Sequence, residues 1–364
     1  MTRIHIAGDS HAYDVVLGSD LIADTGALLS QRFTSRRCAI ISDTNIAPLL
    51  AGTVQDSLAS CGITSTLITL GPGENHKNLA EIAAVIDRLL GAGLDRECFV
   101  IGLGGGVIGD ISGFVAAIFH RGVPHVQIPT TLLAMVDSSI GGKTGVNTSA
   151  GKNLIGAIHH PALVIDDVNC LQTLPEREFR QGFAEIIKHA IISDAEMFEQ
   201  LRVIDVSHLK PNQSGSEALV ALIRRNIEIK GRIISADDQD RKGNRALLNF
   251  GHTVGHGIER ACNYSTFLHG EAISLGIIGA ATVSGERAGL ASGERDSIRE
   301  VLRRFDLPTQ LPNDFPRSEI VQALAFDKKF RQGEVRFVVT PGIGSAYLSS
   351  DVSLDDIERA VEKL

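Results

Sequence analysis

Residues 98–114 read CFVIGLGGGVIGDISGF. An apolar, β-branched run leads into a glycine-rich turn, and a helix-like segment follows that turn. Gly104, Gly106 and Gly109 match the G-x-G-x-x-G spacing, in which glycines let the main chain approach a phosphate and the helix N-terminus supplies N–H donors. A tight strand-to-helix turn without any ligand would carry the same glycines, so the surrounding sequence has to decide between the two readings.

The surrounding sequence repeats the pattern of a strand followed by a helix. Helix-like segments cover residues 78–90 and 107–119, and RIHIAG and YDVVLG near the N-terminus are typical of a small hairpin. The β-branched runs that alternate with helices are CAIISD, STLITL, CFVIGL and HVQIPT, and LVIDDV at residues 163–168 is expected to be one more strand. This alternation predicts an α/β domain with a mainly parallel sheet, a variant of the dinucleotide-binding fold.

The second half of the chain has a different pattern. From Pro175 onward long helical segments dominate, and only VRFVVT and SAYLSS near the end are typical of strands. A length of 364 residues favours two domains. We therefore expect an α/β domain over residues 1–175 and a mostly α-helical domain over residues 176–364.

Composition limits the partners. The net charge is −8 and no basic run is present, which argues against nucleic acid but allows a small anionic substrate. The five cysteines are scattered without a C-x-x-C pair, which favours a reducing compartment. The most apolar stretch, residues 99–119, contains Asp110 and six glycines, so we expect no membrane span and a soluble, cytoplasmic protein.

Polar residues follow several of the predicted strands. Asp43 ends one run, and Glu74 and Lys77 follow the next. Ligands of open parallel sheets bind at the carboxyl ends of strands. The strand after the glycine turn ends in Thr130 and Thr131 without the usual acid, so a dinucleotide is expected in a variant layout.

The segment TTLLAMVDSSIGGKTGVNTSAGKNLIGA carries charged groups among glycine and aliphatic residues. It contains Asp137, Lys143, Lys152 and Asn153, which we expect in a glycine-rich loop. A charge in apolar surroundings costs stability without a partner. Two lysines and an amide therefore indicate a phosphorylated or carboxylated ligand.

Three histidines lie between residues 249 and 271. His252 and His256 are spaced four apart on one helix face, and His269 precedes the next helix. A lone histidine is more often structural than a ligand. Glu185, on an otherwise apolar helix face, adds a carboxylate that a metal would stabilise, with Lys188 one turn later. Two histidines and one glutamate are typical of a catalytic zinc site with an open position, which leaves His256 as a proton carrier.

In order and spacing, these blocks resemble the 3-dehydroquinate synthases of the sugar-phosphate cyclase family. The blocks are GGGVIGD, QIPTTLLAMVDSSIGGKTGVN, GKNLIGA, GFAEIIKHA, LLNFGHTVGH and LHGEA. The resemblance implies conversion of 3-deoxy-D-arabino-heptulosonate 7-phosphate to 3-dehydroquinate and phosphate in the shikimate pathway. It implies that NAD oxidises a hydroxyl transiently and is regenerated after phosphate elimination, before an intramolecular aldol closure. It also implies a homodimer and a zinc ion, with cobalt as a substitute.

The resemblance assigns roles by motif position. Metal ligands would be Glu185, His252 and His269. NAD would be bound by Asp43, Glu74, Lys77, Gly105, Gly106, Val107, Ile108, Gly109, Asp110, Thr130, Thr131, Lys143, Lys152 and Thr173. At the substrate, the hydroxyls would be contacted by Asp137, Asn153 and Lys188, and the carboxylate by Lys230 and Arg245. The phosphate would be bound by Lys143, Asn249, His256 and Lys328, with Lys329 beside it. Arg121 would reach the site from the second subunit.

One departure and three alternatives remain. The family's short acidic stretch before the arginine is here ADDQDRKGNR, one residue longer, so we expect the loop that carries Lys230 and Arg245 to be shifted. A metal-dependent alcohol or glycerol dehydrogenase would share the fold but would not need the basic cluster around Lys143 and Arg245. Another sugar-phosphate cyclase would lack the substrate carboxylate that Arg245 would bind. An NAD-binding regulatory protein would not need the metal ligands.

Overall fold

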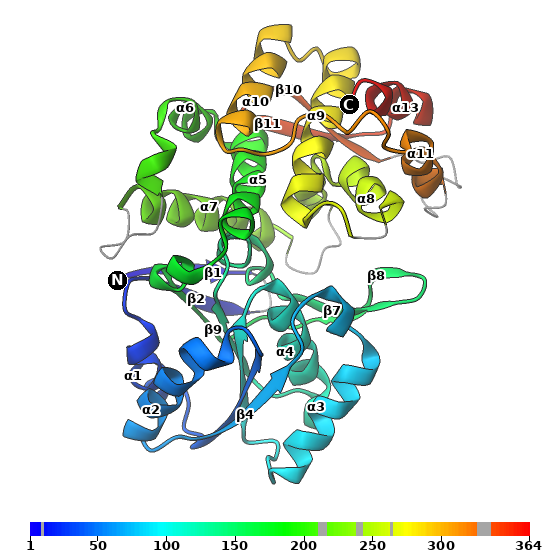
Figure 1. Cartoon of the computed structure of the whole chain (residues 1–364). Coiled ribbons are helices and arrows are strands. Elements are labelled where there is room, and N and C mark those ends of the chain that lie inside the picture. Colours follow the sequence, from blue (N-terminus) through cyan, green and yellow to red (C-terminus); the bar gives the residue numbers. More distant parts are fainter. Residues whose placement is uncertain (9–10, 210–216, 238–242, 263–264, 326–335) are drawn as a thin grey trace. The chain divides into compact units, whose positions relative to one another are not determined.

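The computed structural model describes residues 1–8, 11–209, 217–237, 243–262, 265–325 and 336–364 (Figure 1). The chain forms two compact units, and each unit consists of two separate segments of the sequence. Unit 1 contains Met1–Leu174 and Pro211–Gln239, and unit 2 contains Pro175–Lys210 and Asp240–Leu364. None of the described helices is long and apolar enough to cross a bilayer.

Among the described residues, unit 1 is built on a seven-stranded sheet with the order β1-β2-β9-β6-β5-β3-β4. β1 and β2 form an antiparallel hairpin, and every other pairing in this sheet is parallel. The strands are β1 Thr2–Ala7, β2 Ala12–Gly18, β3 Arg37–Asp43, β4 Thr64–Leu70, β5 Phe99–Gly104, β6 His125–Pro129 and β9 Leu163–Asp167. The predicted α/β fold class is confirmed, because each β-branched run became a strand of one parallel-dominated sheet.

Helices cover the faces of this sheet. The apolar side chains of α3 and α4 pack with β3, β4 and β5 into one buried cluster. The α-helices of unit 1 are α1 Thr25–Ser30, α2 Gly52–Ser60, α3 Leu79–Gly91, α4 Gly106–Ile118 and α7 Glu217–Ser235. Its short 3-10 or π turns are η1 Ile22–Asp24, η2 Ala47–Ala51, η3 Glu74–His76, η4 Phe119–Arg121, η5 Ala134–Ser138 and η6 Val168–Thr173.

Two features of unit 1 differ from the sequence expectation. The glycine-rich loop after residue 142 is an antiparallel hairpin, β7 Lys143–Thr148 with β8 Gly151–Ile158. Glycine makes this pairing possible, since a Cβ at Gly156 would lie 2.0 Å from the Thr144 carbonyl oxygen. Helix α7, expected in the second domain, packs on β1, β2 and η5 of unit 1. A boundary between independently folding domains at residue 175 stays a prediction.

Unit 2 is mostly helical. Helix α9 lies at its centre and contacts α5, α8, α10, α13 and β10. The helices are α5 Glu176–Ser193, α6 Ala195–Val203, α8 His252–Ala261, α9 His269–Arg287, α10 Ser292–Arg304, α11 Arg317–Ala325 and α13 Leu354–Glu362, with short turns η7 Val206–Leu209 and η8 Asn244–Asn249. The two predicted strands are present as the hairpin β10 Phe337–Gly342 and β11 Ser345–Ser349.

Candidate active site

Helix α5 of unit 2 buries a carboxylate and an ammonium group. Glu185 is 0% exposed and Lys188, three residues later, is 1% exposed. Lys188 Nζ forms an ion pair with Glu185 Oε2. Apart from this ion pair, no described residue donates a hydrogen bond to either carboxylate oxygen of Glu185. A buried carboxylate without hydrogen bonds is costly, which indicates that a further ligand belongs beside it.

Two histidines supply the rest of a metal-ligating set. His252 opens α8 and His269 opens α9. His252 Nε2 lies 3.6 Å and His269 Nε2 4.0 Å from Glu185 Oε1. One potential ligand atom from each of the three residues lies within 4.8 Å of the others. This donor set fits a zinc-type ion, which would satisfy the buried carboxylate and leave a coordination position open.

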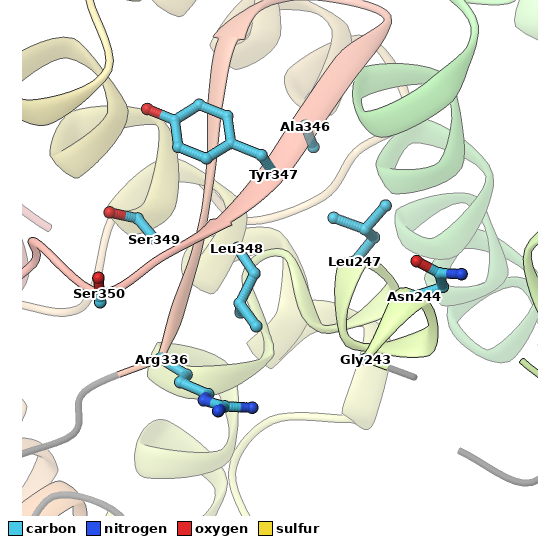
Figure 2. A pocket seen from close by; sticks show the side chains of 9 residues that line it. All are labelled: Gly243, Asn244, Leu247, Arg336, Ala346, Tyr347, Leu348, Ser349 and Ser350. Atoms are coloured by element: carbon cyan, nitrogen blue, oxygen red, sulfur yellow. The ribbon is translucent and has the colours of Figure 1, made fainter. Parts of the chain in front are cut away.

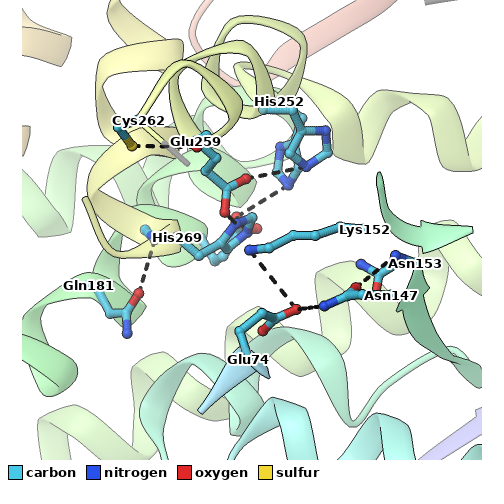
Figure 3. A network of polar contacts seen from close by, with 12 residues as sticks. Glu74, Asn147, Lys152, Asn153, Gln181, His252, Glu259, Cys262 and His269 are labelled. Atoms are coloured by element: carbon cyan, nitrogen blue, oxygen red, sulfur yellow. Dashed lines mark hydrogen bonds and ion pairs between the residues drawn. The ribbon is translucent and has the colours of Figure 1, made fainter. Parts of the chain in front are cut away.

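A row of side chains on α5 aligns it with the start of α9. Arg177, Gln181 and Glu185 are spaced four residues apart and therefore share one helix face. Arg177 donates two hydrogen bonds of 2.7 Å to the Glu271 carboxylate. Gln181 Oε1 accepts one of 3.0 Å from the Gly270 main chain (Figure 3). These contacts hold the first turn of α9, and with it His269, against Glu185.

The third histidine lies beside this set and is more exposed than His252. The His256 ring is 5.3 Å from that of His252 and 6.2 Å from that of His269, centroid to centroid. Its side chain is 60% exposed, whereas that of His252 is 13% exposed. An exposed imidazole beside the ligand set is available to exchange protons with a bound molecule.

Unit 1 holds a second polar cluster, which is centred on a buried lysine. Lys77 is 5% exposed, and its Nζ lies 2.5 Å from Asp110 Oδ2 and 2.6 Å from Asn153 Oδ1. Burial raises the pKa of Asp110, and the Lys77 ammonium opposes that rise. The cluster joins Lys77 and Asp110, both predicted to bind NAD, to Asn153, which was predicted to bind substrate hydroxyls.

Glu74 extends this cluster toward the hairpin of β7 and β8. Its Oε1 accepts a hydrogen bond of 2.8 Å from Asn147 Nδ2 and lies 4.0 Å from Lys152 Nζ (Figure 3). Asn147 Oδ1 in turn accepts from the main chain of Asn153, whose φ is +55°. Sequence reasoning missed Asn147, although this residue ends one of the family-like blocks.

The glycine turn lies at the carboxyl end of β5. Gly105 is the N-cap of α4 and has a negative φ, so its backbone conformation does not require glycine. The close neighbours of Gly104 and Gly105 disfavour a side chain at these positions. A Cβ at Gly104 would lie 2.8 Å from the Ile108 Cβ, and one at Gly105 would lie 3.1 Å from the Thr131 Cγ2. The Thr130 main chain donates to the Gly104 carbonyl. The predicted NAD residues Gly105, Gly106, Val107, Ile108, Gly109, Asp110, Thr130 and Thr131 are therefore brought together.

Asp43 ends β3, the strand next to β5. Its Oδ1 accepts hydrogen bonds from the main chains of Asn45 and Ile46, at 2.8 and 3.0 Å. These contacts stabilise the turn after the strand and orient the carboxylate. Asp43 and the glycine turn both lie at the carboxyl ends of their strands and therefore on the same side of the sheet, because β3 and β5 are parallel neighbours.

Asp137 and Lys230 contact each other in unit 1. Lys230 Nζ, on α7, donates to the main-chain oxygen and to Oδ1 of Asp137, each at 2.6 Å. The family resemblance assigned Asp137 to a substrate hydroxyl and Lys230 to the substrate carboxylate. The observed pair places both groups at one point of unit 1 and keeps their charges balanced.

Of the remaining predicted residues, one is buried, four are exposed and two lie outside the described part. Arg245 is buried in η8, whereas Lys143, Asn249 and Thr173 are exposed. Arg121 is exposed and has a φ of +69°. Lys328 and Lys329 lie outside the described residues. A hollow in unit 2 contains none of the predicted residues; its lining is Gly243, Asn244, Leu247, Arg336, Ala346, Tyr347, Leu348, Ser349 and Ser350 (Figure 2).

A solved structure shares this fold. The valiolone synthase ValA from Streptomyces hygroscopicus subsp. jinggangensis, determined with NAD+ and Zn2+ bound, is 30% identical, and the match covers 98% of each chain with a TM-score of 0.88. The 2-deoxy-scyllo-inosose synthase structure has the same fold at 22% identity and a TM-score of 0.86, covering 100% of this chain and 99% of that one. Fold and site together define the class of sugar-phosphate cyclases.

Family models and relatives narrow the class. The model described as 3-dehydroquinate synthase N-terminal matches residues 67–181, and its C-terminal counterpart matches residues 182–330. A 3-dehydroquinate synthase of Synechococcus sp. (strain CC9605) is 40% identical over 365 residues, covering 100% of this chain and 97% of the relative. The chain belongs to the 3-dehydroquinate synthase family, which confirms the resemblance seen in the sequence.

Proposed function

We propose that this chain converts 3-deoxy-D-arabino-heptulosonate 7-phosphate to 3-dehydroquinate and inorganic phosphate, a step of the shikimate pathway toward aromatic amino acids. The reaction makes it a carbon–oxygen lyase. The observation that carries the proposal is the full-length identity of 40% to a 3-dehydroquinate synthase, compared with 30% to the valiolone synthase. The set of Glu185, which is buried, with the partly buried His252 and His269 adds a ligand group that a dehydroquinate cyclase needs.

NAD and a divalent metal are the proposed cofactors, zinc first and cobalt as a substitute. When bound, NAD supplies reversible hydride transfer and the metal supplies Lewis acidity toward an alcohol oxygen. Glu185, His252 and His269 would hold the metal. In unit 1, the cluster around Lys77, together with the glycine turn, would hold the dinucleotide.

The charged residues of each unit have proposed tasks of their own. Lys188, buried beside Glu185, keeps one ammonium charge fixed at the metal-ligating set. His256 would receive or donate a proton near the substrate phosphate, because its imidazole is exposed. Arg245 would pair with the substrate carboxylate, which distinguishes this substrate from the carboxylate-free substrates of sister cyclases.

Further roles are proposed from the resemblance. Asp137 and Lys230, with Asn153, would contact the substrate, and Lys143, Asn249 and Lys328 would bind its phosphate. A homodimer, with Arg121 reaching the second subunit, and a cytoplasmic location are also proposed. All five cysteines are free thiols in the structure, which supports a reducing compartment.

The test is phosphate release from the heptulosonate phosphate by the full chain with NAD and zinc. NADH absorbance is recorded in the same cuvette. We expect phosphate release without net NADH, arrest by a chelator, and recovery when zinc is restored. Accumulating NADH would indicate a dehydrogenase. No phosphate release by protein with NAD and metal bound would contradict the proposed substrate and favour another sugar phosphate.

The His256→Ala variant tests one residue within the same assay. It should bind zinc and NAD normally, because His256 is outside the ligand set, but release phosphate at least about tenfold more slowly. Full turnover by this variant would exclude the proton-carrying role.

A further inference from the structure

Glu259 on α8 is a buried acid that the proposed reaction does not use. It is 2% exposed, yet it is not one of the three metal ligands of the proposed site. A carboxylate taken out of water needs hydrogen-bonded or charged partners. The groups beside it therefore indicate what it does.

The carboxylate of Glu259 lies between two histidines. Its Oε1 is 3.3 Å from His269 Nδ1 (Figure 3). Its Oε2 is 4.0 Å from His256 Nε2. The other nitrogen of His269, Nε2, faces Glu185 Oε1 at 4.0 Å. The two ring nitrogens of His269 are thus directed at two different carboxylates on opposite edges of the ring.

With a metal ion beside Glu185, this arrangement would select one form of the imidazole. A neutral histidine has one N–H donor and one nitrogen lone pair. If Nδ1–H donates to Glu259, the lone pair is on Nε2 and points toward Glu185 and His252, where the metal is proposed. We propose that Glu259 is a positioning residue that fixes the tautomer and ring orientation of His269 for metal binding, an inference that rests on the proposed metal site.

His252 shows the same arrangement with a different acceptor. Its Nδ1 lies 3.3 Å from the Phe250 carbonyl oxygen, and its Nε2 faces Glu185. Both histidines therefore direct Nε2 to the metal position and Nδ1 to an acceptor. Such acceptors around metal-ligating histidines contribute about 10- to 100-fold in metal affinity. Only the Glu259 acceptor is a side chain, so only this one can be removed by substitution.

A competing arrangement uses the same residues. His256, Glu259 and His269 also bring potential ligand atoms within 4.8 Å of one another. An ion bound there would make Glu259 and His256 ligands. The buried carboxylate of Glu185, which accepts no hydrogen bond from any described residue, favours the first position. The two arrangements predict opposite effects of replacing His256.

The experiment titrates zinc, in competition with a chromophoric chelator, into metal-free full-length protein without substrate. The variants are Glu259→Ala, Glu259→Gln and His256→Ala. We expect about a 100-fold loss of zinc affinity in Glu259→Ala, about a 10-fold loss in Glu259→Gln, whose amide oxygen still accepts the N–H, and wild-type affinity in His256→Ala. The visible spectrum of bound cobalt should change in Glu259→Ala and stay unchanged in His256→Ala.

Two outcomes would overturn the proposal. Wild-type zinc affinity and an unchanged cobalt spectrum in Glu259→Ala would show that His269 needs no partner at Nδ1. A loss in His256→Ala as large as that in Glu259→Ala would make Glu259 a ligand. If the alanine variant does not fold, as judged by circular dichroism, Glu259→Met decides, because this side chain also offers His269 no oxygen acceptor: wild-type zinc affinity in that variant overturns the proposal. Because the titration uses no substrate, a failed cyclase assay would leave this result unaffected.

Discussion

Single residues with buried charge dominate both polar clusters. Glu185 and Lys188 form an ion pair with almost no exposure, and Glu185 receives no hydrogen bond from the described residues. Buried ion pairs contribute little net stability, but losing one partner is costly. The pair is therefore better explained by ligand binding than by folding.

The first prediction concerns metal removal. A chelator should lower the unfolding midpoint of the wild-type protein, because the metal binds the folded chain; at a metal concentration 100-fold above Kd the loss is about 2.7 kcal/mol. Glu185→Gln should bind no zinc and show no response to the chelator. The control is Glu176→Gln on the same helix, exposed and paired with Arg180, which should respond like the wild type. A chelator effect that persists in Glu185→Gln would contradict the assignment.

The second prediction concerns Lys77 in unit 1. Lys77→Met leaves Asp110 beside an apolar side chain, so the free energy of unfolding without NAD should fall by about 3 kcal/mol, measured with urea. The double variant Lys77→Met/Asp110→Asn should recover most of that loss. Lys152→Met is the matched control, since Lys152 is more exposed and 4.0 Å from Glu74, and it should cost less than about 1 kcal/mol. Equal losses for both lysines would contradict the central position of Lys77.

At the scale of elements, the junction of α5 with α9 sets the geometry of the metal ligands. The row Arg177, Gln181 and Glu185 contacts the first turn of α9 at three successive points. A Cβ at Gly270 would lie 2.1 Å from the Gln181 carbonyl oxygen. Only glycine allows the two helices to approach this closely.

The third prediction follows from that approach. Gly270→Ala should destabilise the protein by about 1–3 kcal/mol through overpacking and should also weaken zinc binding, because His269 is the preceding residue. Gly293→Ala on α10 is the control: nothing lies within 4 Å of its Cβ, so this substitution should leave zinc affinity unchanged and stabilise by about 0.5–1 kcal/mol. Denaturant midpoints and zinc titrations of both variants provide the measurement. Zinc affinity that is unchanged in Gly270→Ala would separate the junction from the site.

At the scale of the whole molecule, the pH dependence of stability has an identifiable contribution from the sheet of unit 1. Asp166 on β9 is 0% exposed, and neither of its oxygens is hydrogen-bonded by the described residues. Burial raises the pKa of Asp166 well above 3.8. The folded chain therefore keeps a proton that the unfolded chain releases, so stability falls as the pH rises above that ordinary value, up to the folded pKa.

The fourth prediction uses a neutral replacement. Asp166→Asn has no proton to lose, so its stability relative to the wild type should increase with pH, at up to about 1.4 kcal/mol per unit, from the ordinary pKa of an aspartate up to the raised pKa of Asp166. Urea midpoints measured across neutral pH test the slope. Asp167→Ala should instead lower the free energy of unfolding by about 1–3 kcal/mol. The reason is that Asp167 accepts hydrogen bonds from the main chains of Asp20, Ile22 and Asn169. A pH-independent difference between Asp166→Asn and the wild type would contradict the buried, protonated state.

The sequence predicted the strands and the metal-ligating set for physical reasons. Buried parallel strands need β-branched apolar runs, and these runs are visible without a structure. Glu185 was conspicuous because a carboxylate on an apolar helix face needs a partner. Metal binding by Glu185 stays a prediction until metal binding is measured. NAD binding by the residues of unit 1 stays a prediction until dinucleotide binding is measured.

Other parts could not be predicted from local pattern. The amphipathic pattern of α7 shows that one face is buried but not which unit covers that face. The contact of Lys230 with Asp137 joins residues 93 positions apart, and Asn147 and Glu259 have a role only through partners that folding brings close. Polar residues of this kind have no signature in spacing, because their function depends on tertiary contacts.

The order of segments in unit 1 has a consequence for synthesis on the ribosome. The strands of its sheet are complete by residue 167, but the helix that packs on β1 and β2 ends at residue 235, after α5 and α6 of unit 2. In the nascent chain, the surface of β1 and β2 on which this helix packs therefore stays uncovered by it until about seventy further residues have been translated. A chaperone that binds apolar strands would find its substrate in this interval, and a gene split after codon 174 would make the interval permanent.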